Sequence, residues 1–216
     1  MPHPYDLVIF DNDGVLVDSE PIAAAVLAEL LSESGLPTRP QDAMHDFIGS
    51  SMRRVRRVSE ERLGRGLPDD FERRYHDELF RRFHSELRPV EGVREAVRRI
   101  ETPTCVASSG SPARIRLSLT LVGLWDEFQG RAFSAEAVER GKPAPDLFLH
   151  AAAALGAAPE RCAVIEDSPL GIEAANAAGM DSFGFAGRTP GKWLADASAG
   201  VFSEMRDLPS LLESTG

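Results

Sequence analysis

LVIFDNDG, residues 7–14, runs four apolar residues directly into two carboxylates and a glycine. A short and continuously apolar run is typical of a strand that is buried on both faces, as in a parallel sheet. Alternate side chains of an extended segment point the same way, so Asp11 and Asp13 can share one task. Gly14 lets the chain turn sharply after them. Asn, Asp and Gly are also common turn residues, so an ordinary turn is the alternative for this stretch taken alone.

The composition is that of an acidic globular protein. The 216 residues are 43% hydrophobic and 27% charged, with a formal net charge of −10, which disfavours general binding to nucleic acid or membrane surfaces. Cys105 and Cys162 fall in or beside apolar runs and are expected to be buried free thiols. No apolar run approaches the roughly 20 residues of a membrane helix, and the N-terminus shows no secretion signal. We therefore expect a cytoplasmic monomer with no nucleic-acid or membrane partner.

Four further runs are apolar or small throughout and are expected to be buried strands. They are residues 104–109, 130–135, 162–167 and 181–186. Helical patterns separate the later runs, and two of these patterns end in Gly156 and Gly179, where a left-handed glycine commonly ends a helix. Strands that alternate with helices predict an α/β fold with a doubly wound, Rossmann-like parallel sheet.

Residues 17–87 do not follow this alternation. The segment is rich in Arg, Glu and Leu at helical spacing and contains no convincing strand. Such a long insertion is most simply a helical subdomain. The sequence therefore predicts a catalytic core made of residues 1–16 and 88–216, with a helical cap of residues 17–87 inserted after the first strand. An insertion at this point would overhang the carboxyl ends of the strands, where doubly wound folds bind ligands.

Several polar residues fall at the carboxyl ends of the predicted strands. They are Asp11, Asp13, Ser108, Ser109, Glu166 and Asp167, and Lys142 lies in the loop after the third strand. In a parallel sheet these residues converge on one crevice. Carboxylates from two strand ends make an oxygen-rich site suited to Mg²⁺, and a lysine and a serine hydroxyl opposite them could hold a phosphoryl group.

Four segments, in this order along the chain, resemble the motifs of the haloacid dehalogenase superfamily. They are DNDGVLVDSE (11–20), VASSG (106–110), GKPAPD (141–146) and VIEDSPLGIEAANAAGM (164–180). The EDSPLG form is similar to the capped, β-phosphoglucomutase-like subgroup of small phosphatases and phosphomutases. Within this subgroup, the motif sequences most resemble those of sugar-phosphate phosphatases, including those acting on 6-phosphogluconate.

The resemblance implies a role for each matching residue. Asp11 would be the nucleophile that forms an aspartyl-phosphate, and Asp13 would be the general acid and base. Lys142 would neutralise charge between the nucleophile and the phosphate. Ser108, with the neighbouring groups of Ser109 and Gly110, would hydrogen-bond the phosphoryl oxygens.

The resemblance also implies a Mg²⁺ site and a binding loop in the cap. Asp11, the backbone carbonyl of Asp13, Asp167 and Glu166 would surround the metal ion, with Glu166 as a direct or water-mediated ligand. In the cap, Gly49 and Ser50 would approach the crevice. Arg53 or a neighbour would contact an anionic group of the substrate, although the basic stretch from Met52 also fits a solvated helix face.

These implications predict a Mg²⁺-dependent phosphatase acting on a small phosphorylated metabolite, a sugar or sugar-acid phosphate. Dehalogenation is disfavoured because dehalogenases of the superfamily lack the acid that Asp13 supplies. One alternative is a β-phosphoglucomutase-type phosphomutase. Mutases of this subgroup carry a histidine about one helical turn after the DSE segment, where this chain has Ala23, Ala24 and Ala25. The second alternative is a non-catalytic metabolite-binding protein. The five histidines show no metal-ligand spacing and are expected to be structural or at the surface.

Overall fold

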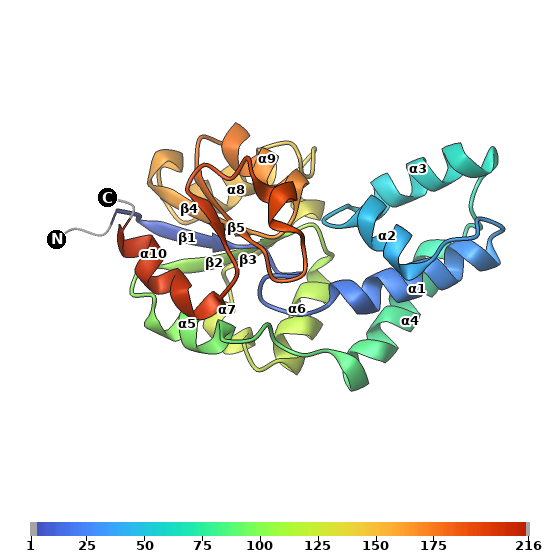
Figure 1. The fold of residues 1–216 in the computed structure, drawn as a ribbon, viewed down its shortest axis with the longest axis horizontal. Coiled ribbons are helices and arrows are strands. Elements are labelled where there is room, and N and C mark those ends of the chain that lie inside the picture. The colour runs from blue at the N-terminus through green and yellow to red at the C-terminus, as the bar shows by residue number, and fades with distance from the viewer. Residues whose placement is uncertain (1–3, 215–216) are drawn as a thin grey trace.

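The computed structural model describes residues 4–214, and its centre is a parallel sheet of six strands (Figure 1). The strands are β1 (Leu7–Phe10), β2 (Thr104–Ser108), β3 (Ala132–Ser134), β4 (Cys162–Glu166), β5 (Asp181–Phe185) and β6 (Gly200–Phe202). Their order is β3-β2-β1-β4-β5-β6, and every neighbouring pair is parallel. The predicted α/β fold is confirmed, and β1, the strand that leads into Asp11, lies inside the sheet between β2 and β4.

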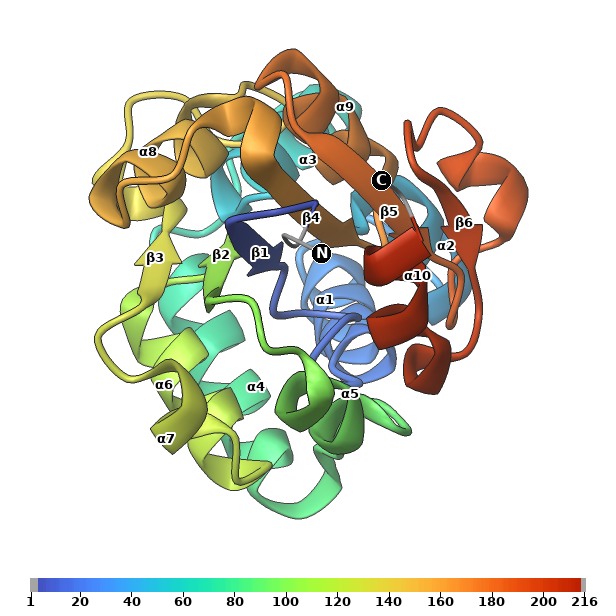
Figure 2. The same cartoon turned by 90° about the vertical axis from the view of Figure 1, so that its left-hand side faces the viewer.

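Both faces of the sheet are covered, which explains the continuous apolar runs in its strands. In β1, Leu7 and Ile9 pack with α8 (Asp146–Ala154) and α9 (Pro169–Ala177) on one face. Val8 and Phe10 belong to the cluster on the other face, which Figure 2 shows covered by several helices. These are α5 (Val93–Arg99), α6 (Pro112–Leu121), α7 (Trp125–Phe128) and α10 (Leu208–Ser214). Strands buried on both faces lose the polar–apolar alternation of one-sided sheets.

Several local predictions are confirmed and one is incomplete. Gly156 and Gly179 follow α8 and α9 with φ of +71° and +73°, and Cys105 and Cys162 are buried free thiols. The sequence predicted five strands and missed β6. This edge strand has three residues and is largely exposed, so it lacks the buried apolar run that marks the other strands. Short 3₁₀ helices connect several elements, at Ala135–Ala137, Pro159–Arg161, Gly191–Leu194 and Met205–Asp207.

Four helices between β1 and α5 lie to one side of the sheet (Figure 1). They are α1 (Glu20–Glu33), α2 (Pro40–Phe47), α3 (Met52–Leu63) and α4 (Phe71–Glu86), called here the cap helices. The segments that lead into and out of them are hydrogen-bonded to each other, because the Asp18 amide donates to Arg88 O (2.9 Å) and the Val90 amide donates to Leu16 O (3.1 Å). The helical content predicted for residues 17–87 is present, and the boundaries at 17 and 87 stay a prediction. Among residues 4–214, none of the helices has the length and apolar character needed to cross a membrane.

The apolar packing of the cap helices leads to a first prediction. Leu79 of α4 is completely buried, so Leu79→Ala leaves a cavity and should lower the free energy of unfolding by about 2–5 kcal/mol. Urea denaturation followed by circular dichroism measures this change. Leu149→Ala is the control, since Leu149 is 37% exposed and its truncation should cost less than about 1 kcal/mol. Equal losses in the two variants would contradict the packing described here.

Candidate active site

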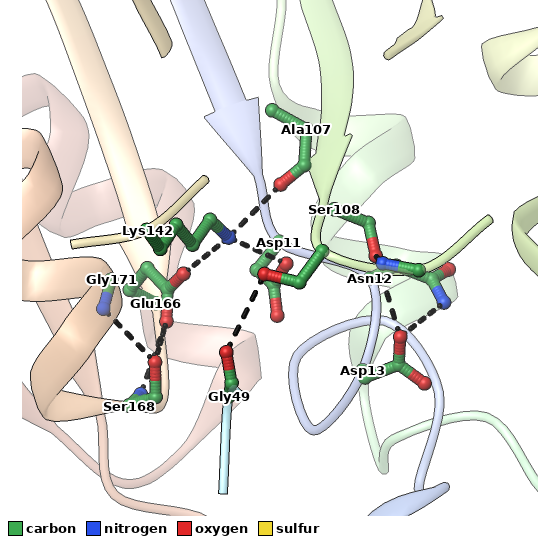
Figure 3. A network of polar contacts seen from close by, with 12 residues as sticks. Asp11, Asn12, Asp13, Gly49, Ala107, Ser108, Lys142, Glu166, Ser168 and Gly171 are labelled. Atoms are coloured by element: carbon green, nitrogen blue, oxygen red, sulfur yellow. Dashed lines mark hydrogen bonds and ion pairs between the residues drawn. The ribbon is translucent and has the colours of Figure 1, made fainter. Parts of the chain in front are cut away.

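Lys142 lies at the centre of a polar network at the carboxyl ends of the strands (Figure 3). Its Nζ donates to Asp11 Oδ1 (2.8 Å), Glu166 Oε1 (2.6 Å) and the carbonyl of Ala107 (3.1 Å). The register explains the meeting of these groups, because Phe10 is level with Val106 on β2 and with Ile165 on β4. The next residues along the three strands are therefore Asp11, Ala107 and Glu166. Burial alone would lower the pKa of Lys142, but the carboxylates of Asp11 and Glu166 raise it, so the ammonium stays charged.

Asp11, Glu166 and Asp167 bring their carboxylate oxygens within 4.8 Å of one another, and all three residues are buried. Burial raises the pKa of Asp11 to about 7, against the opposing charge of Lys142. Burial, followed by the neighbouring carboxylates, raises the pKa of Asp167 well above its usual value. A bound cation would relieve this crowding of negative charge. The donor set contains only carboxylate oxygens, and Mg²⁺ prefers hard oxygen ligands, so these residues fit Mg²⁺.

Asp13 is held by a second cation, Arg114 of α6. Arg114 Nη2 lies 2.6 Å and its Nε 3.1 Å from Asp13 Oδ1, and the Ser19 hydroxyl donates to the same oxygen at 2.6 Å. Burial alone would raise the pKa of Asp13, but Arg114 and these hydrogen bonds lower it. Asn12 Nδ2 donates to Asp13 Oδ2 (3.2 Å). Asp11 and Asp13 therefore open on the same crevice with separate cationic partners.

Arg114 also reaches the cap helices. Its Nη1 lies 3.5 Å from the hydroxyl of Tyr75 on α4, and its guanidinium lies 5.7 Å from the centre of the Phe83 ring. Sequence reasoning missed this residue, because a single arginine early in a predicted helix is ordinary. Arg114 therefore connects the Asp13 carboxylate in the core to a cap helix.

The serines at the carboxyl end of β2 lie beside these carboxylates. Ser108 Oγ is 3.4 Å from Asp13 Oδ2 and accepts from the Gly110 amide at 3.0 Å. Ser109 Oγ donates to the carbonyl of Gly49 at 3.4 Å, so the loop between α2 and α3 touches the loop after β2 (Figure 3). The predicted groups from the core and the cap thus meet at one place.

Two glycines are required by close approach to the acidic cluster. A Cβ on Gly171 would lie 1.8 Å from the carboxyl carbon of Glu166, and a Cβ on Gly14 would lie 2.0 Å from Asp167 Oδ2. Gly14 also has φ of +80°, which disfavours other residues. Ser168 caps the N-terminus of α9, where its side chain accepts from the Gly171 amide and Pro169 takes the first helical position. Its own amide and hydroxyl donate to Glu166 Oε2, at 3.0 and 2.9 Å.

A cavity of about 720 Å³ lies between these residues and the cap helices. Its walls include the predicted residues Asp11, Asp13, Gly49, Ser50, Arg53, Ser108, Ser109, Gly110 and Lys142. Glu166 and Asp167 are not among its lining residues, although their carboxylate oxygens lie within 4.8 Å of Asp11. Arg53 is exposed at the rim, whereas its neighbour Arg54 is half-buried. The volume suits a small metabolite, since ligand pockets commonly measure about 300–1,000 Å³.

Glu20, at the first position of α1, is a further wall residue that the sequence did not single out. An acid in the first turn of a helix usually complements the helix dipole, so its sequence position looks ordinary. Burial and then the charge of Asp13 raise the pKa of Glu20 to about 8. The side chain is therefore largely neutral at pH 7 and can both donate and accept hydrogen bonds.

Comparisons with known proteins show the family of the chain. The family model of haloacid dehalogenase-like hydrolases matches residues 5–179. The chain is 30% identical over 212 residues to a 6-phosphogluconate phosphatase of Escherichia coli K12, covering 98% of this chain and 96% of the relative.

Solved structures show the same architecture. A haloacid dehalogenase-like protein from Agrobacterium tumefaciens C58 is 37% identical with a TM-score of 0.82, covering 96% of this chain and 97% of the other. A haloacid dehalogenase family hydrolase from Deinococcus radiodurans R1, solved with bound phosphate and sodium, is 31% identical with a TM-score of 0.76, covering 97% of this chain and 96% of the other.

The buried Glu20 leads to a pH-dependent prediction for the metal-free protein. Its pKa rises from 4.5 to about 8 on folding. The neutral side chain therefore contributes its full stabilisation of the folded state below pH 4.5, and this contribution is lost as the pH rises through about 8. Glu20→Gln cannot ionise. The difference in the free energy of unfolding between Glu20→Gln and the wild type should therefore favour the variant by roughly 1–3 kcal/mol more at pH 8 than at pH 5.

Urea unfolding in EDTA at the two pH values measures this difference. Glu91→Gln is the control, because the Glu91 side chain is 95% exposed and its replacement should shift stability equally at both. A gain for Glu20→Gln that is the same at pH 5 and pH 8 would show that Glu20 is not buried as a neutral acid.

Proposed function

The chain belongs to the haloacid dehalogenase-like hydrolase family, and from this premise we propose that it is a Mg²⁺-dependent phosphatase. Its substrate would be a small phosphorylated metabolite, a sugar or sugar-acid phosphate, hydrolysed through an aspartyl-phosphate on Asp11. Relatives named as phosphatases of 6-phosphogluconate, of fructose 1-phosphate and of phosphorylated carbohydrates support this substrate class.

The observation that carries the proposal is the buried ammonium of Lys142 between Asp11 and Glu166. The Lys142 side chain is only 1% exposed, and those of Asp11 and Glu166 are 7% and 0% exposed. A carboxylate attacking a phosphate ester brings two anions together, and a fixed positive charge beside both offsets their repulsion. A merely structural ion pair has no need of a cavity beside it, and Asp11 opens on one.

In the proposed first step, a carboxylate oxygen of Asp11 attacks phosphorus and the bond from phosphorus to the ester oxygen breaks. Asp13 donates a proton to the departing oxygen, so the product leaves as an alcohol. Ser108 and the amides of Ser109 and Gly110 hydrogen-bond the phosphoryl oxygens. Lys142 stabilises the charge that the transferring group shares with Asp11.

In the second step, Asp13 takes a proton from a water molecule that attacks the aspartyl-phosphate. The bond between Asp11 and phosphorus breaks, which regenerates the carboxylate and releases inorganic phosphate. Arg114 and Ser19 hold Asp13 as a carboxylate in this structure, which is the form that this step requires. The proton that Asp13 gains here supplies the general acid for the next turnover.

Asp11, Asp167, the backbone carbonyl of Asp13 and, directly or through water, Glu166 would hold Mg²⁺. When bound, the ion neutralises charge on the phosphate and orients it toward Asp11. The cap helices would cover the cavity and keep bulk water away during the first transfer.

A phosphomutase would use the same nucleophile but return the phosphoryl group to a sugar hydroxyl instead of water. The region where those mutases carry a histidine contains Ala23 and Ala24, which are buried, and Ala25. Product analysis separates the two reactions, because hydrolysis yields inorganic phosphate and the mutase converts β-glucose 1-phosphate to glucose 6-phosphate. A non-catalytic protein would bind metabolites without either product.

The nucleophile gives the first functional prediction. Asp11→Asn should reduce phosphate release at least about 1,000-fold, since an amide cannot attack phosphorus. Phosphate release is measured with hexose phosphates, 6-phosphogluconate, phosphoglycolate and β-glucose 1-phosphate. Asp126→Asn, which changes an exposed aspartate on α7, is the charge-matched control and should keep full activity. An Asp11→Asn protein that is folded and fully active would refute this mechanism.

The proposed metal site gives a second prediction with a readout that is independent of turnover. Saturating Mg²⁺ should raise the Tm of the wild type relative to EDTA, because binding to the folded state alone stabilises by about 2.7 kcal/mol at 100 times Kd. Asp167→Asn should lose most of this increase, whereas Asp126→Asn should retain it. Differential scanning calorimetry measures both. The same increase in all three proteins would place the ion elsewhere.

A further inference from the structure

Three polar atoms in the wall of the cavity of about 720 Å³ lack a hydrogen-bond partner. Among residues 4–214, five buried side-chain polar atoms have none, and three of them belong to Ser50 (Oγ), Arg54 (Nε) and His76 (Nδ1), which line this cavity. An unsatisfied buried donor or acceptor costs about 1–3 kcal/mol, so such atoms need an explanation. All three belong to the cap, in the loop before α3, in α3 and in α4. The reacting groups Asp11 and Lys142 belong to the core.

The arginines of α3 indicate the charge of the ligand group that this wall would attract. Arg56 pairs with Glu60 at 2.9 Å and Arg57 pairs with Glu61 at 3.0 Å, each one helical turn away. In the described part of the chain, no acidic side chain lies within ion-pair distance of Arg53 or Arg54. Two unpaired cations side by side are unusual in a protein with a net charge of −10. They make the cap wall attractive to an anionic group.

His76 shows that the same wall also needs a donor from the ligand. Its Nε2 lies 3.8 Å from Glu72 Oε1, which favours the proton on Nε2. Burial and the charge of Arg114 lower the pKa of His76, so the ring is neutral near pH 7 and Nδ1 is an acceptor. Arg54 Nε, in contrast, can only donate. Ser50 can do both.

We propose that Ser50, Arg54 and His76 bind the non-reacting end of the substrate, and that this end carries a carboxylate flanked by hydroxyl groups. The carboxylate accepts from Arg54 and from the Ser50 hydroxyl, and a neighbouring hydroxyl donates to His76 Nδ1. The substrate class is then a phosphorylated polyhydroxy acid rather than a neutral sugar phosphate. This inference rests on the proposed phosphatase function, and the cavity of about 720 Å³ has room for such a molecule.

The test compares two substrates that differ at one carbon. Gluconate 6-phosphate and glucitol 6-phosphate share an open six-carbon chain, and C1 is a carboxylate in the first and a CH₂OH group in the second. Arg54→Gln should lower kcat/KM for gluconate 6-phosphate roughly 10- to 100-fold, mainly through KM, because a charge-assisted hydrogen bond is lost. For glucitol 6-phosphate the change should stay below about 3-fold.

Arg57→Gln is the matched control, since it removes one arginine from the same helix but one that is already paired with Glu61. It should change kcat/KM less than about 2-fold for both substrates. The Arg54 side chain has no partner to lose, so Arg54→Gln should unfold at the same urea concentration as the wild type. An equal loss for both substrates, or no loss for either, would overturn the inference while leaving the phosphatase proposal intact.

The acceptor role of His76 is tested by two further variants. Asn can place its side-chain oxygen close to the position of Nδ1, whereas Leu has no polar atom there. His76→Leu should raise KM for both substrates roughly 5- to 20-fold, and His76→Asn should restore most of the loss. Equal behaviour of the two variants would remove His76 from the proposed site.

A binding measurement keeps the inference separate from turnover. Calorimetric titration of gluconate 6-phosphate into Asp11→Asn should show saturable binding that the added Arg54→Gln change weakens roughly 10-fold or more. If the wild type hydrolyses neither compound but this selective binding is found, the phosphatase proposal fails and the binding site stands. Weaker binding of gluconate than of glucitol 6-phosphate would overturn the site.

Discussion

The structure depends on one buried charge, the ammonium of Lys142 among the strand ends. Asp11, Glu166 and Asp167 place three buried carboxyl groups close together. Without a cation, at least some of them would have to be protonated, because burying like charges together is costly. Lys142 offsets that cost by contacting two of them directly. The same ion pair fixes the Asp11 carboxylate beside the cavity, so the requirement for stability and the proposed requirement for chemistry are met by one side chain.

The acidic cluster also sets the backbone around it. The Glu166 side chain occupies the space that a side chain at position 171 would need, so glycine is required there. The Asp167 side chain has the same effect at Gly14. Gly49 has φ of +68°, and a Cβ there would lie 2.5 Å from Ser168 Oγ. This last contact brings the loop of the cap onto the start of α9, next to Asp167. The position of the cap loop is therefore coupled to the residues proposed to hold the metal ion, by direct packing of backbone against side chain.

The parts of the fold that sequence could predict are those with a strong local pattern. The runs that contain Ile9 and Val164 are apolar throughout because both faces of their strands are covered, and that pattern needs no structure to be recognised. The convergence of Asp11, Lys142 and Asp167 followed from the rule that parallel strands end at one edge. β6 and Arg114 were beyond this reasoning. β6 is exposed and short, and the importance of Arg114 comes from the distant residue Asp13, to which no periodicity points.

Glu20 and Arg54 show a related limit. An acid that begins a helix and an arginine on a basic helix are ordinary in sequence, and only burial changes their meaning. Glu20 becomes a largely neutral acid because its carboxyl group is buried and lies near the charge of Asp13. Arg54 stands out because its neighbours Arg56 and Arg57 have partners and it has none. In both cases the informative feature is an ionisable group without an ion-pair partner of opposite charge among residues 4–214. Whether such a partner is present depends on the residues that the tertiary structure brings near.

In the proposed reaction, the two sides of the cavity have different roles. The core side presents groups that any phosphate monoester would satisfy, since Asp11, Ser108 and Lys142 would contact only phosphorus and its oxygens. In the proposed substrate site, the cap side presents donors and an acceptor whose partners would come from the rest of the substrate. A cap wall can therefore change through substitutions such as those at Arg54 or His76 without disturbing the buried ion pairs of the core. Selectivity and stability would thereby be separated, because the ion pairs of Lys142 and Arg114 are made within the protein, whereas the proposed cap site would be completed by the ligand.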